Sequence, residues 1–200
     1  MTENICDRII GESKSVFVCP IDEICKHMQN FVAFGSKVLF LTDFGLTKAE
    51  RTERALFKSY RVETVSVPEY TRAFARSVAL PEDARAVVCA GDGKAAAVAK
   101  YVATRYNRPF VFVALTPDIS TVQLPSSMLE EENYSEVYKT EPPVLTLLDS
   151  NMEDSETRTA AGFGEVCSRL VAIFDYELSG LMGGEKTNRS VCVDALEVIK

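Results

Sequence analysis

The residues best suited to chemistry in this sequence are Gly91-Asp92-Gly93-Lys94, a short turn between two contrasting segments. An apolar run at 86–90 precedes the turn, and an alanine-rich segment of strong helix formers follows it. This order predicts a strand, a glycine turn and a helix, which together present free backbone N–H groups and the positive end of a helix dipole to a phosphate. Glycines at such a turn also let a pyrophosphate approach the backbone closely.

Two charged side chains complicate this prediction. Asp92 places a carboxylate in a turn that should attract an anion, and its repulsion of a bound pyrophosphate would cost on the order of 1–4 kcal/mol. Lys94 has two interpretations, since it can neutralise a phosphate or pair with Asp92. For the turn as a whole, the alternative to nucleotide binding is a tight connection that no longer holds a ligand.

The turn lies within a repeating order of strands and helices. Short apolar runs typical of strands in a buried sheet occur at 15–19, 37–43, 62–67, 86–90, 110–114 and 144–148. Segments with helical spacing follow the first four runs, including 21–32, 47–60 and 68–78. We therefore predict an α/β fold, a Rossmann-like parallel sheet with helices on both faces.

Ligands of such folds bind at the carboxyl ends of the strands. That rule places Asp43, the turn 91–94 and the loop 115–121 at one edge of the predicted sheet. Residues 130–139 are acidic, with two tyrosines, and are compatible with either a hairpin or a surface excursion.

The C-terminal part differs in character. Residues 150–156 are polar and acidic, and they mark the boundary that we predict between an α/β domain at 1–152 and a helical part at 153–200. Two helices cannot bury a core of their own. We expect them to begin an incomplete all-α domain and to pack on the first domain, on another chain, as in a homo-oligomer, or on residues absent from this sequence. The apolar residues on one predicted helical face are Phe163, Val166, Cys167, Leu170, Val171, Phe174 and Leu178.

Composition excludes several classes of partner. The net charge of −7 and the scattered basic residues argue against nucleic acid and anionic membranes. No apolar run approaches the roughly 20 residues that span a bilayer, and the N-terminus lacks the features of a signal peptide. The six cysteines show no CxxC spacing, which favours reduced thiols and a cytoplasmic location. His27 is the one histidine of this sequence, so the sequence cannot supply a metal site of two or three histidines.

The stretch GDGKAAAVAK at 91–100 resembles the GGGK-x-x-D-x-AK stretch of the iron-containing alcohol dehydrogenase, glycerol dehydrogenase and 3-dehydroquinate synthase superfamily. Supporting pieces follow the same order along nearly the whole chain. Within the superfamily the likeness is greatest to the sn-glycerol-1-phosphate dehydrogenase and glycerol dehydrogenase branch. The pieces are KVLFLTD at 37–43, PFVFVALTPDIST at 109–121, PPVLTLLD at 142–149 and AAGFGEVCSRLVAIFDYEL at 160–178.

The resemblance implies a site for NAD at the carboxyl edge of the sheet. The glycine turn would hold the pyrophosphate, and Asp43 would face the adenosine ribose. A carboxylate there accepts hydrogen bonds from both ribose hydroxyls but repels a 2′-phosphate, which favours NAD over NADP. Asp43 is equally compatible with a solvated strand end. The candidate cofactor-binding residues are Asp43, Gly91, Asp92, Gly93, Lys94, Thr116 and Ser120.

The resemblance also implies a zinc or iron ion that polarises the substrate oxygen. The acidic metal ligand of the superfamily falls on Glu165, whereas its two histidine ligands have no counterpart before Lys200. We therefore assign no catalytic residue.

The sequence is compatible with two functions. The first is an NAD(P)-dependent, metal-dependent polyol or glycerol(-phosphate) dehydrogenase-like protein that lacks the histidine-bearing part of its metal site, so that these 200 residues alone should be inactive. The alternative is a non-catalytic nucleotide-binding or assembly module, a pseudoenzyme that retains the fold.

Overall fold

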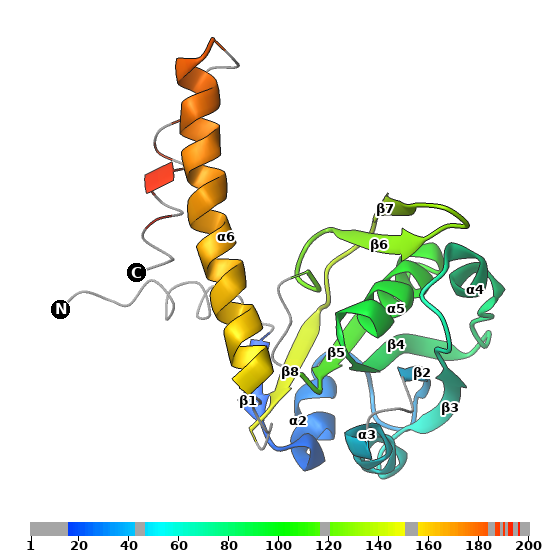
Figure 1. Ribbon diagram of the computed structural model, residues 1–200. Helices are drawn as coiled ribbons and strands as arrows, with labels where there is room; N and C mark the ends of the chain where they lie inside the picture. Colours follow the sequence, from blue (N-terminus) through cyan, green and yellow to red (C-terminus); the bar gives the residue numbers. More distant parts are fainter. Residues whose placement is uncertain are drawn as a thin grey trace. The chain divides into compact units, whose positions relative to one another are not determined.

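The computed structural model describes residues 16–42, 47–116, 121–150 and 156–183, together with residues 187, 188, 190, 192, 193 and 196. The chain divides into two compact units (Figure 1). One unit is Ser15–Glu153, and the other combines Met1–Lys14 with Asp154–Lys200.

A six-stranded sheet forms the centre of the first unit. Its order is β1-β8-β5-β4-β2-β3, and each pair of neighbouring strands is parallel. The six predicted strands are therefore confirmed, as is the parallel sheet. Their bounds are β1 Val16–Cys19, β2 Lys37–Thr42, β3 Arg61–Ser66, β4 Ala84–Gly91, β5 Phe110–Ala114 and β8 Leu145–Asp149.

Helices cover both faces of this sheet because successive side chains of a strand point to opposite sides. On one face Phe40 and Val88 are buried with residues of the 3-10 helix η1 (Ile21–Glu23), α2 (Ile24–Met28) and α3 (Thr47–Phe57). On the other face Leu41 and Cys89 are buried with residues of α4 (Arg72–Ser77) and α5 (Gly93–Arg105). The helices on both faces are as predicted.

Helix α4 is shorter than the predicted segment 68–78. Thr71 has extended backbone, and its Oγ1 accepts a hydrogen bond from the backbone N–H of Phe74 at 3.1 Å. This is the arrangement of an N-cap residue, so the helix begins at Arg72 and the residues before it remain extended.

The polar stretch after β5 contains a two-stranded antiparallel hairpin, β6 (Ser126–Glu130) with β7 (Ser135–Lys139). Of the two readings left open for 130–139, the hairpin is therefore correct. Strand β6 begins before this range, at Ser126. Leu129 is buried with residues of α5, while Met128 points the other way and is exposed. In Figure 1 the hairpin lies beside α4 and α5.

Helix α6 (Glu156–Leu181) is the main described element of the second unit. Several of its large apolar side chains are exposed, among them Phe163, Val171, Phe174 and Leu181. Only a few residues of the expected last helix lie in the described part of the chain. None of the described helices is long and apolar enough to cross a membrane. None of the five cysteines that the structure describes forms a disulfide.

Candidate functional site

The strand order brings the carboxyl ends of three strands together. Thr42 at the end of β2 is in register with Ala90 of β4, and Gly91 is in register with Ala114 of β5. Thr42 Oγ1 also donates a hydrogen bond to the Ala90 carbonyl oxygen at 3.1 Å. Asp43 and Ser120 lie outside the described residues, so their cofactor contacts stay predictions.

Asp92 is the N-cap of α5. Its Oδ1 accepts hydrogen bonds from the backbone N–H groups of Lys94 and Ala95, each at 3.0 Å. These are donors that a phosphate at the start of the helix would use. The carboxylate therefore both repels an added anion and occupies part of its site. This cap was not predicted from the sequence, although an aspartate directly before a run of helix formers is a recognised capping signal.

The two glycines of the turn make close packing possible. A Cβ on Gly91 would lie 3.0 Å from the Cβ of Ala95, and a Cβ on Gly93 would lie 3.3 Å from Thr121 Oγ1. Gly91 therefore lets α5 turn back against its own strand, while Gly93 lets the chain at Thr121 approach the start of the helix.

A cavity of about 420 Å³ opens between the first turns of α5 and the hairpin. Two lysines and one carboxylate contribute charge, while the opposite wall is largely apolar. Of the predicted site residues, Asp92, Gly93 and Lys94 line it, whereas Gly91 and Thr116 are buried and do not. The lining residues are Asp92, Gly93, Lys94, Ala97, Lys100, Thr121, Val122, Leu124, Ser126, Ser127, Met128 and Val137.

Lys100 is the least expected member of the site, since only 1% of it is exposed. Its Nζ donates hydrogen bonds to the carbonyl oxygens of Thr121 at 3.4 Å, Val122 at 3.0 Å and Leu124 at 2.8 Å. Burial lowers the pKa of Lys100 to about 8. The three acceptors match the three protons of an ammonium group, so the side chain is charged at neutral pH. Lys100 thereby ties the residues 121–124 to α5.

The sequence had pointed to Lys100 only as a match to the superfamily stretch. A stronger signal was present, because Lys100 is the one charged residue between positions 95 and 104 of a helix otherwise rich in alanine and valine. A charge on a helix face of that kind is buried only where it finds partners.

Lys94 does not pair with Asp92 in this structure, while its predicted contact with a phosphate stays a prediction. Its Nζ lies 5.4 Å from the ring centroid of Tyr70, and in the described part of the chain it forms no ion pair with Asp92. A cation–π contact of this kind on an exposed side chain is worth about 0.5–1 kcal/mol. The ammonium group is therefore available to an anion in the cavity at small cost.

The residues that the structure describes do not fit a zinc or iron site. Glu165 lies in α6, but its side chain is outside the described part. Among the described residues, no group of three histidine, cysteine, aspartate or glutamate side chains is arranged to hold a metal ion. Because structural and catalytic sites for these metals need several such ligands, we derive no metal-assisted step.

Sequence comparison finds relatives at low identity, while no family model matches the chain. A glycerol-1-phosphate dehydrogenase [NAD(P)+] from Bacillus licheniformis is 23% identical over 142 residues, which cover 70% of this chain and 35% of that protein. A second protein of that description, from Methanococcus aeolicus, is 28% identical over 95 residues, covering 46% of this chain and 27% of its own length. The chain thus spans about a third of the curated relatives that it matches.

Solved structures share the fold. The glycerol dehydrogenase from Schizosaccharomyces pombe superposes with a TM-score of 0.64 at 15% identity, over 79% of this chain and 43% of that one. The NADH-dependent butanol dehydrogenase A from Thermotoga maritima gives a TM-score of 0.65 at 19% identity, over 83% and 50% of the two chains. At these identities the structural likeness establishes the architecture, and the sequence relatives supply the link to a family of dehydrogenases.

Proposed function

We propose that this chain is the nucleotide-binding part of an NAD(P)-linked polyol or glycerol-phosphate dehydrogenase-like protein. In sequence it resembles the iron-containing alcohol dehydrogenase, glycerol dehydrogenase and dehydroquinate synthase-like superfamily, and it has the α/β fold of that superfamily. The observation that carries the proposal is the cavity beside the first turns of α5, the helix that follows the carboxyl end of β4 through the glycine turn. Folds of this architecture bind nucleotides at that position.

The lining of the cavity supports a ligand that carries both negative charge and a flat apolar ring. Lys94 and Lys100 bring positive charge to one side, while Leu124, Met128 and Val137 supply apolar surface on the other. Asp92 opposes the pyrophosphate at the start of α5. We therefore expect the unmodified chain to bind NADH only in the millimolar range, and we assign it no catalytic residue.

A fluorescence titration with NADH tests this proposal directly. We expect saturable binding by the unmodified chain, and tighter binding by Asp92→Gly, in which the donors of Lys94 and Ala95 are freed. Absence of a signal from both proteins at millimolar NADH would rule out the nucleotide-binding function.

A second proposal of another class is a non-catalytic assembly module that retains the fold. It is favoured by the exposed apolar side chains along α6, which would be costly to leave in water. On this proposal α6 mediates association with another copy of the chain. Sedimentation velocity at several protein concentrations distinguishes it, because a strictly monomeric chain would contradict it whether or not NADH binds.

A further inference from the structure

Three consecutive residues, Tyr70, Thr71 and Arg72, contact α5 and the hairpin segment but do not line the cavity themselves. Tyr70 and Thr71 lie between β3 and α4, Thr71 is the N-cap of α4, and Arg72 is its first residue. The capped turn therefore holds the short segment 70–72 in one conformation.

Backbone contacts join this segment to the hairpin. The N–H of Glu130, the last residue of β6, donates a hydrogen bond to the Tyr70 carbonyl oxygen at 3.0 Å. Thr71 forms an isolated parallel bridge with the same Glu130. These two backbone contacts fix the end of β6 against segment 70–72.

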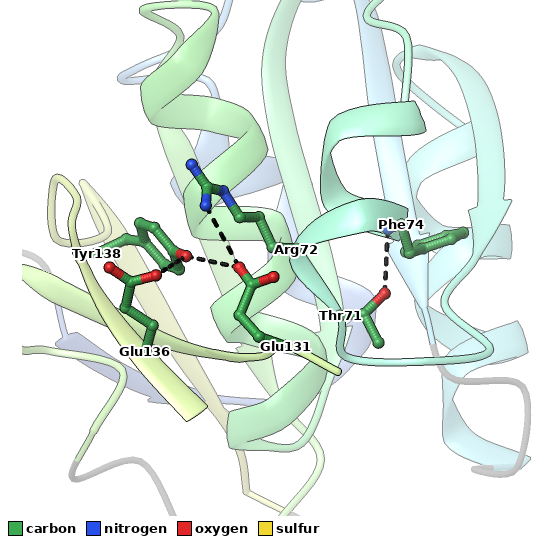
Figure 2. A network of polar contacts seen from close by, with 6 residues as sticks. All are labelled: Thr71, Arg72, Phe74, Glu131, Glu136 and Tyr138. Atoms are coloured by element: carbon green, nitrogen blue, oxygen red, sulfur yellow. Dashed lines mark hydrogen bonds and ion pairs between the residues drawn. The ribbon is translucent and has the colours of Figure 1, made fainter. Parts of the chain in front are cut away.

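A side-chain network strengthens the junction (Figure 2). Arg72 Nη1 lies 3.4 Å from Glu131 Oε1, and the Tyr138 hydroxyl donates to the same oxygen at 2.7 Å. The Arg72 guanidinium also stacks 4.7 Å above the Tyr138 ring, and the Tyr138 hydroxyl lies within hydrogen-bond distance of Glu136. The Arg72–Glu131 pair is only 29% and 23% exposed, so water screens it less than a surface pair.

The same segment reaches the opposite wall of the cavity. The Tyr70 ring lies under the Lys94 ammonium group, in the first turn of α5. Tyr101 lies one helical turn after Ala97 in α5. Its ring packs edge-on against the ring of Tyr138, with 5.5 Å between the ring centroids. Met128 and Val137, which are among the lining residues of the cavity, lie on the opposite face of the same two strands, so these contacts fix the strands that carry them.

We propose that Arg72, with Glu131 and Tyr138, is a positioning residue of the cavity: the network holds the hairpin against α5, and the affinity of the cavity for its ligand depends on it. The ligand in this inference is the nucleotide of the proposed function. The contacts that hold the hairpin do not depend on that function. A rigid wall lowers the entropy that must be lost when a ligand is bound.

The test compares Arg72→Met, Arg72→Lys and Tyr138→Phe by NADH titration and by amide hydrogen exchange of β6, β7 and the first turn of α5. We expect Arg72→Met to weaken NADH binding roughly fivefold and to speed exchange in the hairpin. Arg72→Lys, which keeps the charge beside Glu131 and over the ring, should restore most of the affinity. Tyr138→Phe should give a smaller loss because it keeps both ring contacts.

Arg61→Met is the matched control, because Arg61 pairs with Asp83 at 3.2 Å near the amino-terminal end of the sheet, far in register from the cavity. It should change neither readout. Unchanged hairpin exchange in Arg72→Met would overturn the inference, and so would faster exchange with unchanged NADH affinity.

If no protein in the series binds NADH, the proposed function fails while the inference is still decided by hydrogen exchange. Faster exchange in both the hairpin and the first turn of α5 would then support it. Exchange that stays at the level of the unmodified chain would overturn it.

Discussion

The Asp92 carboxylate accepts a hydrogen bond from the backbone N–H of Ala95 at 3.0 Å, so the first turn of α5 already holds an anion that belongs to the chain. A bound pyrophosphate would compete for this donor and would face the same charge. The interaction that stabilises the helix is therefore also the one that limits phosphate binding.

Replacing Asp92 separates these two effects. Asp92→Asn keeps a side-chain oxygen that can cap α5 but removes the charge, and we expect NADH to bind about tenfold more tightly or better. Asp92→Gly should gain at least as much, because it also frees the backbone donors. Fluorescence titration at low and moderate salt provides the measurement.

Asp83→Asn serves as the control for that experiment. It makes the same change of charge near the start of β4, beside Lys37 and Arg61, and should leave NADH affinity unchanged. Equal affinities for Asp92→Asn and the unmodified chain would show that the carboxylate does not limit binding.

Gly91→Ala should destabilise the first unit by about 1–3 kcal/mol, since the added Cβ would lie 3.0 Å from the Cβ of Ala95. Urea unfolding followed by circular dichroism measures the change. Gly164→Ala provides a matched substitution within helix α6, where the added Cβ meets nothing within 4 Å, and should stabilise that helix by up to about 1 kcal/mol. A Gly91→Ala protein as stable as the unmodified chain would contradict the packing role.

Lys100 should make stability depend on pH above neutrality. Its pKa is about 8 in the folded chain, against an ordinary value of 10.5. Between these values the unfolded chain holds the proton more tightly than the folded chain, so the free energy of unfolding rises with pH across this window. Measured against Lys100→Met, which has no such proton, the stability of the unmodified chain should increase from pH 8 towards 10.5.

Two further observations belong to the same experiment. Lys100→Met should cost about 1–3 kcal/mol at pH 7, because three carbonyl oxygens lose their donor. Lys100→Arg keeps its charge throughout the range and should show no such rise against Lys100→Met. A flat difference for the unmodified chain would mean that Lys100 does not change its charge in the folded state.

Self-association through α6 is tested with Phe174→Ser, since Phe174 is an exposed aromatic residue in the second half of that helix. If α6 joins two copies, the substitution should weaken association by tenfold or more, as expected for a central aromatic contact. Sedimentation velocity gives the measurement. Phe57→Ser, which removes an exposed aromatic residue from α3 in the other unit, should leave association unchanged.

The sequence predicted the sheet well because its strands are short, continuous apolar runs between clear turn and helix signals, as in 37–42 and 110–114. It did not decide the hairpin, because β7 is exposed along most of its length and carries no apolar pattern for burial. The cavity wall at Met128 and Val137 was therefore missed. The contacts of Lys100 and Arg72 could not be predicted because their partners are distant in the sequence. The carbonyl oxygens that accept from Lys100 are more than twenty residues away from it, and Glu131, the partner of Arg72, follows β6.

The position of β1 at the end of the sheet has a consequence for the order of folding. Val16 pairs with Thr146, so the first described strand finds its partner only in the last strand of the sheet. During synthesis β1 must stay unpaired until β8 has left the ribosome, whereas β2, β3 and β4 can already associate. Completion of this edge is thus a late, non-local step, and until then the apolar edge of the unfinished sheet is open to other chains.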